Sequence, residues 1–223
     1  MRVLGFPGSL RRDSYNRRLL RAAAQLFPKE VVFELWSGIG DLPAYNEDLE
    51  GAEPPPAVVR LRADISAADA LLFATPEYNS SVPGGLKNAL DWASRPYATN
   101  VLRQKPVAVV GASTGFFGAV WAQAELRQIL RACSALVLDR QLPLARASEA
   151  FSSDRSLADP ELAAALVEIV QELVCLARSS EVSGECERRG SRARDRLRGP
   201  RSVRRNALPS GVNRGNGSRI TAD

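Results

Sequence analysis

Short apolar runs alternate with longer helical patterns along the first 178 residues, and this feature most constrains the fold. The apolar runs predict strands, at residues 2–6, 31–35, 68–74, 106–111 and 135–138. The segments between them predict helices, at residues 15–27, 56–67, 85–94, 117–132 and 160–177. Strict alternation is typical of βαβ units. The sequence therefore predicts an α/β fold, a doubly wound five-stranded parallel sheet with helices on both faces. Its ligand site should lie beyond the carboxyl ends of the strands.

The surplus of positive charge in this chain is confined to its end. The 223 residues carry a formal charge of +5, but residues 179–223, with 11 arginines and 5 acidic residues, carry +6, and residues 1–178 carry −1. Few large apolar residues occur after 178, so we predict a single domain at 1–178 and a disordered arginine-rich tail at 179–223. The tail has no aromatic interleaving and no binding motif, which argues against specific nucleic-acid binding.

The complete absence of histidine restricts the chemistry that the side chains can perform. It excludes Ser-His and Cys-His catalysis and most zinc sites, so we expect no catalytic side chain, no metal, and chemistry carried by a cofactor. Cys133, Cys175 and Cys186 form no Cys-x-x-Cys pair and are interpreted as reduced thiols. With no leader pattern and no apolar run long enough for a membrane span, the sequence predicts a cytoplasmic protein without a membrane partner.

A polar segment, Gly-Ser-Leu-Arg-Arg-Asp-Ser-Tyr-Asn at 8–16, follows the first predicted strand and leads into a helix. Glycine permits a tight turn, and hydroxyl and guanidinium groups gather where the free N–H groups of a helix begin. This combination predicts a phosphate cradle. The alternative is that Ser14 only caps the helix and the arginines are solvated. The segment is neither a Gly-x-Gly-x-x-Gly fingerprint nor a P-loop.

A second segment, at 76–92, follows the third predicted strand and reads Pro-Glu-Tyr-Asn-Ser-Ser-Val-Pro-Gly-Gly-Leu-Lys-Asn-Ala-Leu-Asp-Trp. Prolines and glycines fix a loop whose backbone amides can face a planar ligand, and Tyr78 and Asn79 add an aromatic edge and an amide. Leu86, Leu90 and Trp92 share one helix face, which we expect to be buried.

A third segment, Gly-Ala-Ser-Thr-Gly at 111–115, follows the fourth predicted strand. The three segments occur in the same order as three motifs of one known protein family. Over residues 1–178 the sequence closely resembles the NADPH-dependent FMN reductase family, flavodoxin-like proteins that include quinone, chromate and azo-dye reductases. The resemblance assigns one group of residues to the FMN phosphate: Ser9, Arg11, Ser14 and Asn16. It assigns a second group to the isoalloxazine: Pro76, Glu77, Tyr78, Asn79, Ser113, Thr114 and Gly115. Tyr15 is either a flavin contact or a core aromatic, and the Glu77 side chain either contacts flavin or caps a helix.

By this resemblance the protein is an NAD(P)H-dependent FMN oxidoreductase. It passes electrons by ping-pong hydride transfer from NADPH or NADH to a small acceptor such as a quinone, an azo compound, chromate or free flavin. The family implies a homodimer or homotetramer. The alternative is a flavodoxin-type electron carrier. Flavodoxins usually have acidic surfaces and a threonine-rich phosphate loop, whereas residues 1–178 are nearly neutral and the 8–16 loop contains arginines, which favours the reductase.

Overall fold

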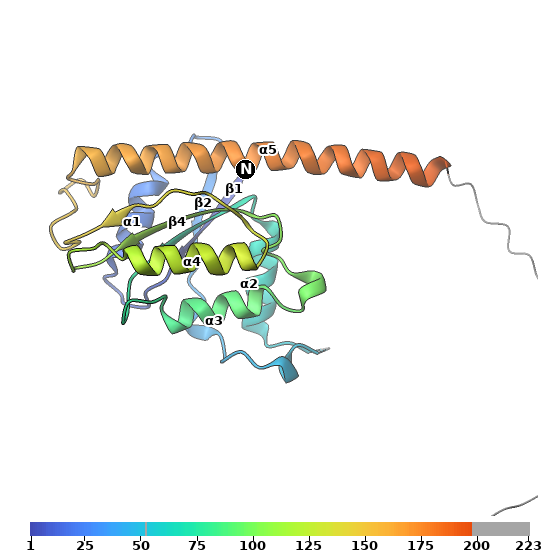
Figure 1. Cartoon of the computed structure of the whole chain (residues 1–223), viewed down its shortest axis with the longest axis horizontal. Coiled ribbons are helices and arrows are strands. Elements are labelled where there is room, and N and C mark those ends of the chain that lie inside the picture. The colour runs from blue at the N-terminus through green and yellow to red at the C-terminus, as the bar shows by residue number, and fades with distance from the viewer. Residues whose placement is uncertain (52, 198–223) are drawn as a thin grey trace, which may run out of the picture. The chain divides into compact units, whose positions relative to one another are not determined.

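The computed structural model describes residues 1–51 and 53–197 (Figure 1). Its strands are β1 (Arg2–Pro7), β2 (Val32–Leu35), β3 (Ala70–Thr75), β4 (Pro106–Ala112), β5 (Leu136–Val137) and β6 (Pro143–Leu144). Its helices are α1 (Tyr15–Ala24), α2 (Pro56–Ala67), α3 (Gly84–Ala93), α4 (Val120–Ala132) and α5 (Pro160–Leu197). The chain divides into a compact unit, Met1–Gly184, and a second unit, Glu185–Asp223, whose described part is the last portion of α5.

The strands form one parallel sheet in the order β2-β1-β3-β4-β5. This is the order of flavodoxin-like doubly wound folds, so the predicted fold class is confirmed. The chain reverses its direction across the sheet between β1 and β3, and ligands bind at such a switch point. The carboxyl ends of β1, β3 and β4 therefore define where a site is expected.

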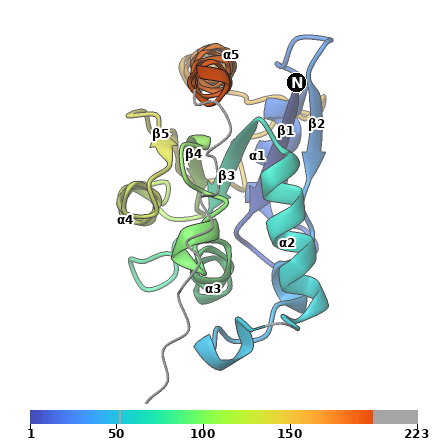
Figure 2. The ribbon, with the colours of Figure 1, turned by 90° about the vertical axis from the view of Figure 1, so that its right-hand side faces the viewer.

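Two apolar cores cover the two faces of the sheet. Successive residues of β3 alternate between them, with Leu71 and Phe73 in one core and Leu72 and Ala74 in the other. Helices α2, α3 and α4 contribute to the first core, and α1 and α5 contribute to the second (Figure 2). Leu86, Leu90 and Trp92 are all buried in the first core, as the helical spacing predicts, so this face of α3 belongs to the interior.

The fifth strand differs from the prediction of one continuous strand at 135–138. It consists of two short strands, β5 and β6, which pair with different parts of β4. The fully buried Gln123 side chain accepts from the Leu142 N–H (3.0 Å) and donates to the Leu142 carbonyl oxygen (3.1 Å), in the manner of a strand neighbour. A Cβ on Gly111 would lie only 2.8 Å from the Gln123 amide nitrogen. Glycine at this position makes room for the inserted amide.

Helix α5 extends past the end predicted from the sequence. We expect the helix to end at 177 and disorder from 179 onward, whereas the structure continues the helix to Leu197. Residues 179–197 contain three glutamates and five arginines, which favour helix, and the first proline after them is Pro200. Residues 198–223, where the rest of the predicted tail falls, lie outside the described residues. In the part that is described, no helix is long and apolar enough to cross a membrane.

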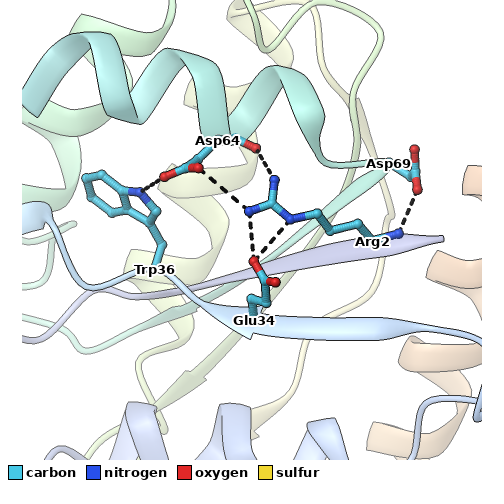
Figure 3. A network of polar contacts seen from close by, with 5 residues as sticks. All are labelled: Arg2, Glu34, Trp36, Asp64 and Asp69. Atoms are coloured by element: carbon cyan, nitrogen blue, oxygen red, sulfur yellow. Dashed lines mark hydrogen bonds and ion pairs between the residues drawn. The ribbon is translucent and has the colours of Figure 1, made fainter.

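A polar network fixes the amino end of β1, opposite to the end where a ligand is expected (Figure 3). The Arg2 guanidinium donates to Glu34 on β2 (2.7 Å) and lies 3.6 Å from an Asp64 carboxylate oxygen on α2. The Arg2 backbone N–H donates to Asp69 (2.6 Å), and the Trp36 indole donates to Asp64 (3.0 Å). The hydrogen bond that Arg2 donates to Glu34 raises the pKa of Arg2 above its usual value. The network joins the two strands to the helix that covers them.

Candidate functional site

A pocket lies at the carboxyl ends of β1, β3 and β4, where the switch point predicts it. Its lining residues come from the three loops that follow these strands: Ser9, Arg11, Ser14, Tyr15, Asn16, Pro76, Glu77, Tyr78, Ala112, Ser113 and Thr114. The structure thus brings together ten of the residues that the sequence assigns to the cofactor. Asn79 and Gly115 do not line the pocket, and Ala112 lines it without having been predicted.

The loop between β1 and α1 supplies the polar wall of the pocket. Ser9 is 4% exposed and its hydroxyl accepts from the Arg11 N–H (3.3 Å), while the Gly8 N–H is fixed to the Ala74 carbonyl oxygen (2.8 Å). Ser14 caps α1 by accepting from the Arg17 N–H (3.3 Å). A hydroxyl that accepts one bond still has its own proton to donate. The helix cap and a phosphate contact are therefore compatible roles for Ser14.

Asn16 connects this loop to β4. Its side-chain amide donates to the Ala112 carbonyl oxygen (2.9 Å) and accepts from the Ala112 N–H (2.9 Å), and the residue is 2% exposed. Both ends of the amide are thus engaged within the protein. The observed function of the side chain is to hold the start of α1 against the end of β4.

The carboxylate of Glu77 caps α4 from the neighbouring loop. One of its oxygens accepts from the N–H groups of Trp121 (3.0 Å) and Ala122 (3.0 Å). Helix α4 has no capping side chain of its own, because Ala119 occupies the N-cap with a φ of 61°. Of the two interpretations left open for Glu77, the structure shows the helix cap.

Glu125 on α4 holds the same loop in return. A single carboxylate oxygen, Oε2, accepts from the Ser81 hydroxyl (2.7 Å) and from the Val82 N–H (3.0 Å). The turn from Tyr78 to Ser81 is closed by two backbone bonds of 3.2 Å, with φ of 53° at Asn79 and 59° at the next residue. Two successive left-handed residues define a type I′ turn, which is strained where neither residue is glycine. Glu125 therefore stabilises a strained turn beside the pocket.

Two aromatic side chains border the polar wall. The Tyr78 hydroxyl lies 3.4 Å from the Ser9 hydroxyl, and its side chain is half exposed. Tyr15 is partly buried against the second core and stacks on Phe151 with ring centroids 6.4 Å apart. Tyr15 thus packs on the core, which was one of the two roles considered for it, and it also lines the pocket.

The loop after β4 forms the third wall and is held by β6. The Ser113 N–H donates to the Leu144 carbonyl oxygen (3.0 Å), and the Ser113 hydroxyl accepts from the Gly115 N–H (3.1 Å). The bulky pair that follows, Phe116 and Phe117, is exposed and lies outside the pocket lining. Phe117 contacts Trp121 edge to face at 4.9 Å.

The groups in the pocket fit a phosphate ester attached to a flat ring. Hydroxyls, a guanidinium and the N–H groups of the first turn of α1 form the polar wall, and these are donors suited to an anion. The carboxylate in the pocket lining, Glu77, accepts hydrogen bonds from the N–H groups at the start of α4. Across the described ranges no group of three Cys, Asp or Glu side chains is arranged to hold a metal ion.

Two residues that shape this site, Gln123 and Glu125, were not singled out from the sequence. Gln123 lies at helical spacing from Leu126 and Leu130, in the buried stripe of α4. A polar residue within an apolar stripe is a pattern that could have identified Gln123 from the sequence. Glu125 gives no such signal, because its partners are 43 and 44 residues away in the chain.

Comparison with known proteins gives consistent matches. The family model described as NADPH-dependent FMN reductase matches residues 1–149. An NAD(P)H-dependent FMN reductase of Pseudomonas aeruginosa is 47% identical over 71% of this chain and 85% of its own length. An NAD(P)H:quinone oxidoreductase of Solanum tuberosum is 39% identical over 84% of this chain and 97% of its own. Among solved structures, the flavoenzyme NAD(P)H:(acceptor) oxidoreductase FerB of Paracoccus denitrificans is 40% identical, with a TM-score of 0.71 over 80% of this chain and 98% of that one.

Proposed function

Because this chain belongs to the NADPH-dependent FMN reductase family, we propose that it binds FMN in the pocket beyond β1, β3 and β4 and oxidises NAD(P)H there. It is an oxidoreductase of the kind named in its relatives, an NAD(P)H-dependent FMN or quinone reductase. The single observation that carries the placement of FMN is the donor-rich wall of the pocket, which faces a half-exposed aromatic edge.

The 8–16 loop would hold the phosphate. Ser9 and Ser14 supply hydroxyl donors, Arg11 supplies a guanidinium, and the start of α1 supplies backbone N–H groups. Asn16 acts as a positioning residue, because its amide is fully engaged with Ala112. These donors match one phosphomonoester, which favours FMN over a dinucleotide flavin.

The two other loops would flank the isoalloxazine through their backbone. Glu77 and Glu125 hold the 76–82 segment from both directions, so that the backbone around Tyr78 and Asn79 is positioned before any ligand arrives. Ser113 and Thr114 line the opposite side of the pocket. When bound, FMN would supply hydride transfer, and the residues of the three loops would hold and orient it.

The nicotinamide nucleotide and the acceptor would occupy the same site in turn, which corresponds to ping-pong kinetics. The proposed acceptors are small flat or oxidising molecules such as quinones, azo compounds, chromate or free flavin. We further propose a homodimer or homotetramer in the cytoplasm. Exposed Phe116, Phe117 and Trp121 at the start of α4 support a subunit contact, since large apolar groups gathered at one surface favour association.

A flavodoxin-type carrier remains the competing function, and the observations favour the reductase. The 1–178 segment carries a net charge of −1, and Arg11 lines the pocket in place of a threonine-rich loop. The relatives compared above are named as NAD(P)H oxidoreductases and not as carriers.

Anaerobic absorbance spectroscopy tests the proposal. The purified protein should show a flavin spectrum, release FMN and not FAD on denaturation, and bleach when NADPH is added without oxygen. Initial rates at several fixed quinone concentrations should give parallel double-reciprocal lines. A colourless protein that takes up no FMN on titration would refute the proposal, and a flavoprotein that NADPH and NADH both fail to bleach would be a carrier.

A further inference from the structure

A second hollow lies beside α1, next to the pocket proposed for FMN. It encloses about 400 Å³, and its lining includes Arg18 and Arg21 from α1 and Phe151 and Arg155 from the segment after β6. Asp13 is the one acidic residue in the lining. This volume lies within the range of small-molecule sites. Three guanidinium groups around one cavity give it a strongly positive wall.

These guanidinium groups have no acidic partner within the described part of the chain. Arg18, Arg21 and Arg155 take part in no ion pair there, whereas Arg140 and Arg178, for example, pair with glutamates at 2.7 to 2.9 Å. Arginines that converge on a cavity without carboxylate partners are arranged to receive an anion, and the planar guanidinium suits phosphate in particular.

The turn that presents Arg155 is itself ordered by hydrogen bonds. Phe151 and Leu157 form a bridge, and the Ser152 N–H donates to the Ser156 carbonyl oxygen (3.0 Å). Asp154, the acidic neighbour of Arg155, accepts from the Ser156 hydroxyl (2.7 Å) and from its N–H (3.1 Å). Asp154 therefore bonds within the turn, and in the described part of the chain it forms no ion pair with Arg155.

An aromatic stack separates the hollow from the FMN pocket. The ring of Tyr15, which lines the FMN pocket, lies nearly parallel to Phe151, which lines the hollow, at an interplanar angle of 10°. The guanidinium of Arg18 lies 5.3 Å above the Tyr15 ring. The two sites are thus adjacent, and the hollow offers an aromatic surface beside its positive charge.

We propose that this hollow binds the 2′-phosphorylated adenosine end of NADPH, and that Arg21 and Arg155 determine preference for NADPH over NADH. The inference rests on the proposed function, which brings the nicotinamide end to the neighbouring pocket. The two nucleotides differ by one phosphomonoester on the adenosine ribose, which is the group that unpaired arginines recognise. A flat adenine finds an aromatic partner in Phe151.

Steady-state kinetics on the FMN-loaded enzyme test the assignment. Each exposed charge-assisted hydrogen bond to phosphate corresponds to about a tenfold change in affinity, so Arg21→Gln with Arg155→Gln should raise the KM for NADPH by about 30- to 100-fold. The kcat with NADPH and both constants with NADH should not change. Lysine at both positions, which retains the charge but loses the planar fork, should give an intermediate KM.

The matched control removes two arginines from elsewhere on the surface. Arg60 and Arg131 are about half exposed and lie on α2 and α4, so Arg60→Gln with Arg131→Gln removes the same charge away from both cavities. This variant should keep the wild-type NADPH to NADH ratio. Arg18 is left in place in all variants, because its contact with Tyr15 couples it to the FMN pocket.

Equilibrium binding separates the inference from the proposed function. By calorimetry, adenosine 2′,5′-bisphosphate should bind the wild type and lose affinity in the glutamine variant, whereas adenosine 5′-monophosphate, which lacks the 2′-phosphate, should bind both equally weakly. Three results in the glutamine variant would each overturn the assignment. They are an equal rise in KM for NADPH and NADH, a fall in FMN affinity, and unchanged binding of the bisphosphate. Failure of the wild type to hold FMN would instead refute the proposed function, and the bisphosphate titration would still test the hollow.

Discussion

Replacing Glu125 tests whether α4 positions the turn beside the flavin site. In Glu125→Ala, the Ser81 hydroxyl and the Val82 N–H lose the oxygen that accepts both of them. Hydrogen bonds to a charged group contribute about 1.5–3 kcal/mol each, and two bonds that share one oxygen are not additive, so we expect the free energy of unfolding to fall by about 2–3 kcal/mol. The left-handed residues Asn79 and Ser80 then lose their support and relax.

The same substitution should weaken flavin binding through the isoalloxazine side. We expect the dissociation constants of FMN and riboflavin to rise by a similar factor of about tenfold, equivalent to one positioned hydrogen bond. Urea unfolding and quenching of flavin fluorescence measure the two effects. Glu125→Gln is the matched variant, because its amide oxygen can accept both bonds, and it should recover most of the stability. Gln128→Ala, at an exposed position of the same helix, controls for helix propensity.

Either of two results would contradict this role of Glu125. A Glu125→Ala protein with unchanged stability and flavin affinity would show that the turn holds its shape without the carboxylate. A Glu125→Gln protein as damaged as the alanine variant would show that the charge, and not the pair of hydrogen bonds, is what matters.

Three further changes test other parts of the structure. Replacing Ser9, Arg11 and Ser14 together by Ala should weaken FMN binding by about three to four decades, from a loss of about 4–6 kcal/mol in contacts to phosphate, and leave riboflavin binding unchanged; copurification with stoichiometric FMN would remove these residues from the phosphate site. Arg2→Gln should lower the free energy of unfolding in urea by about 1 kcal/mol without affecting FMN affinity, since its network lies at the opposite end of β1; a change in FMN affinity would contradict this separation. Removing residues 185–223 should leave the Tm and turnover unchanged but abolish salt-sensitive adsorption to polyanions, and a clear fall in Tm would show that this segment stabilises the domain.

Local sequence patterns carried much of the fold and part of the site. Alternating apolar runs predicted where five strands lie along the chain, because strand periodicity and burial are local properties of the chain. The glycine, hydroxyl and proline patterns after β1, β3 and β4 predicted the three loops that meet at the pocket. The prediction and the structure differ in two places. The fifth strand is split because the buried Gln123 side chain bonds to the backbone there. Helix α5 is longer than predicted because a helix-favouring composition continues after the core segment.

The sequence by itself determined the order of strands and helices and the positions of the polar loops, since each depends on neighbouring residues alone. Its composition also excluded histidine chemistry. Only the tertiary structure decided how these loops are held. Asn16 meets Ala112 across 96 residues, and Glu125 meets Ser81 across 44. Arg21 and Arg155 come to one hollow from different segments. A hydrogen-bond partner distant in the chain leaves no local pattern, because its identity depends on which backbone groups the packed sheet and helices bring within reach.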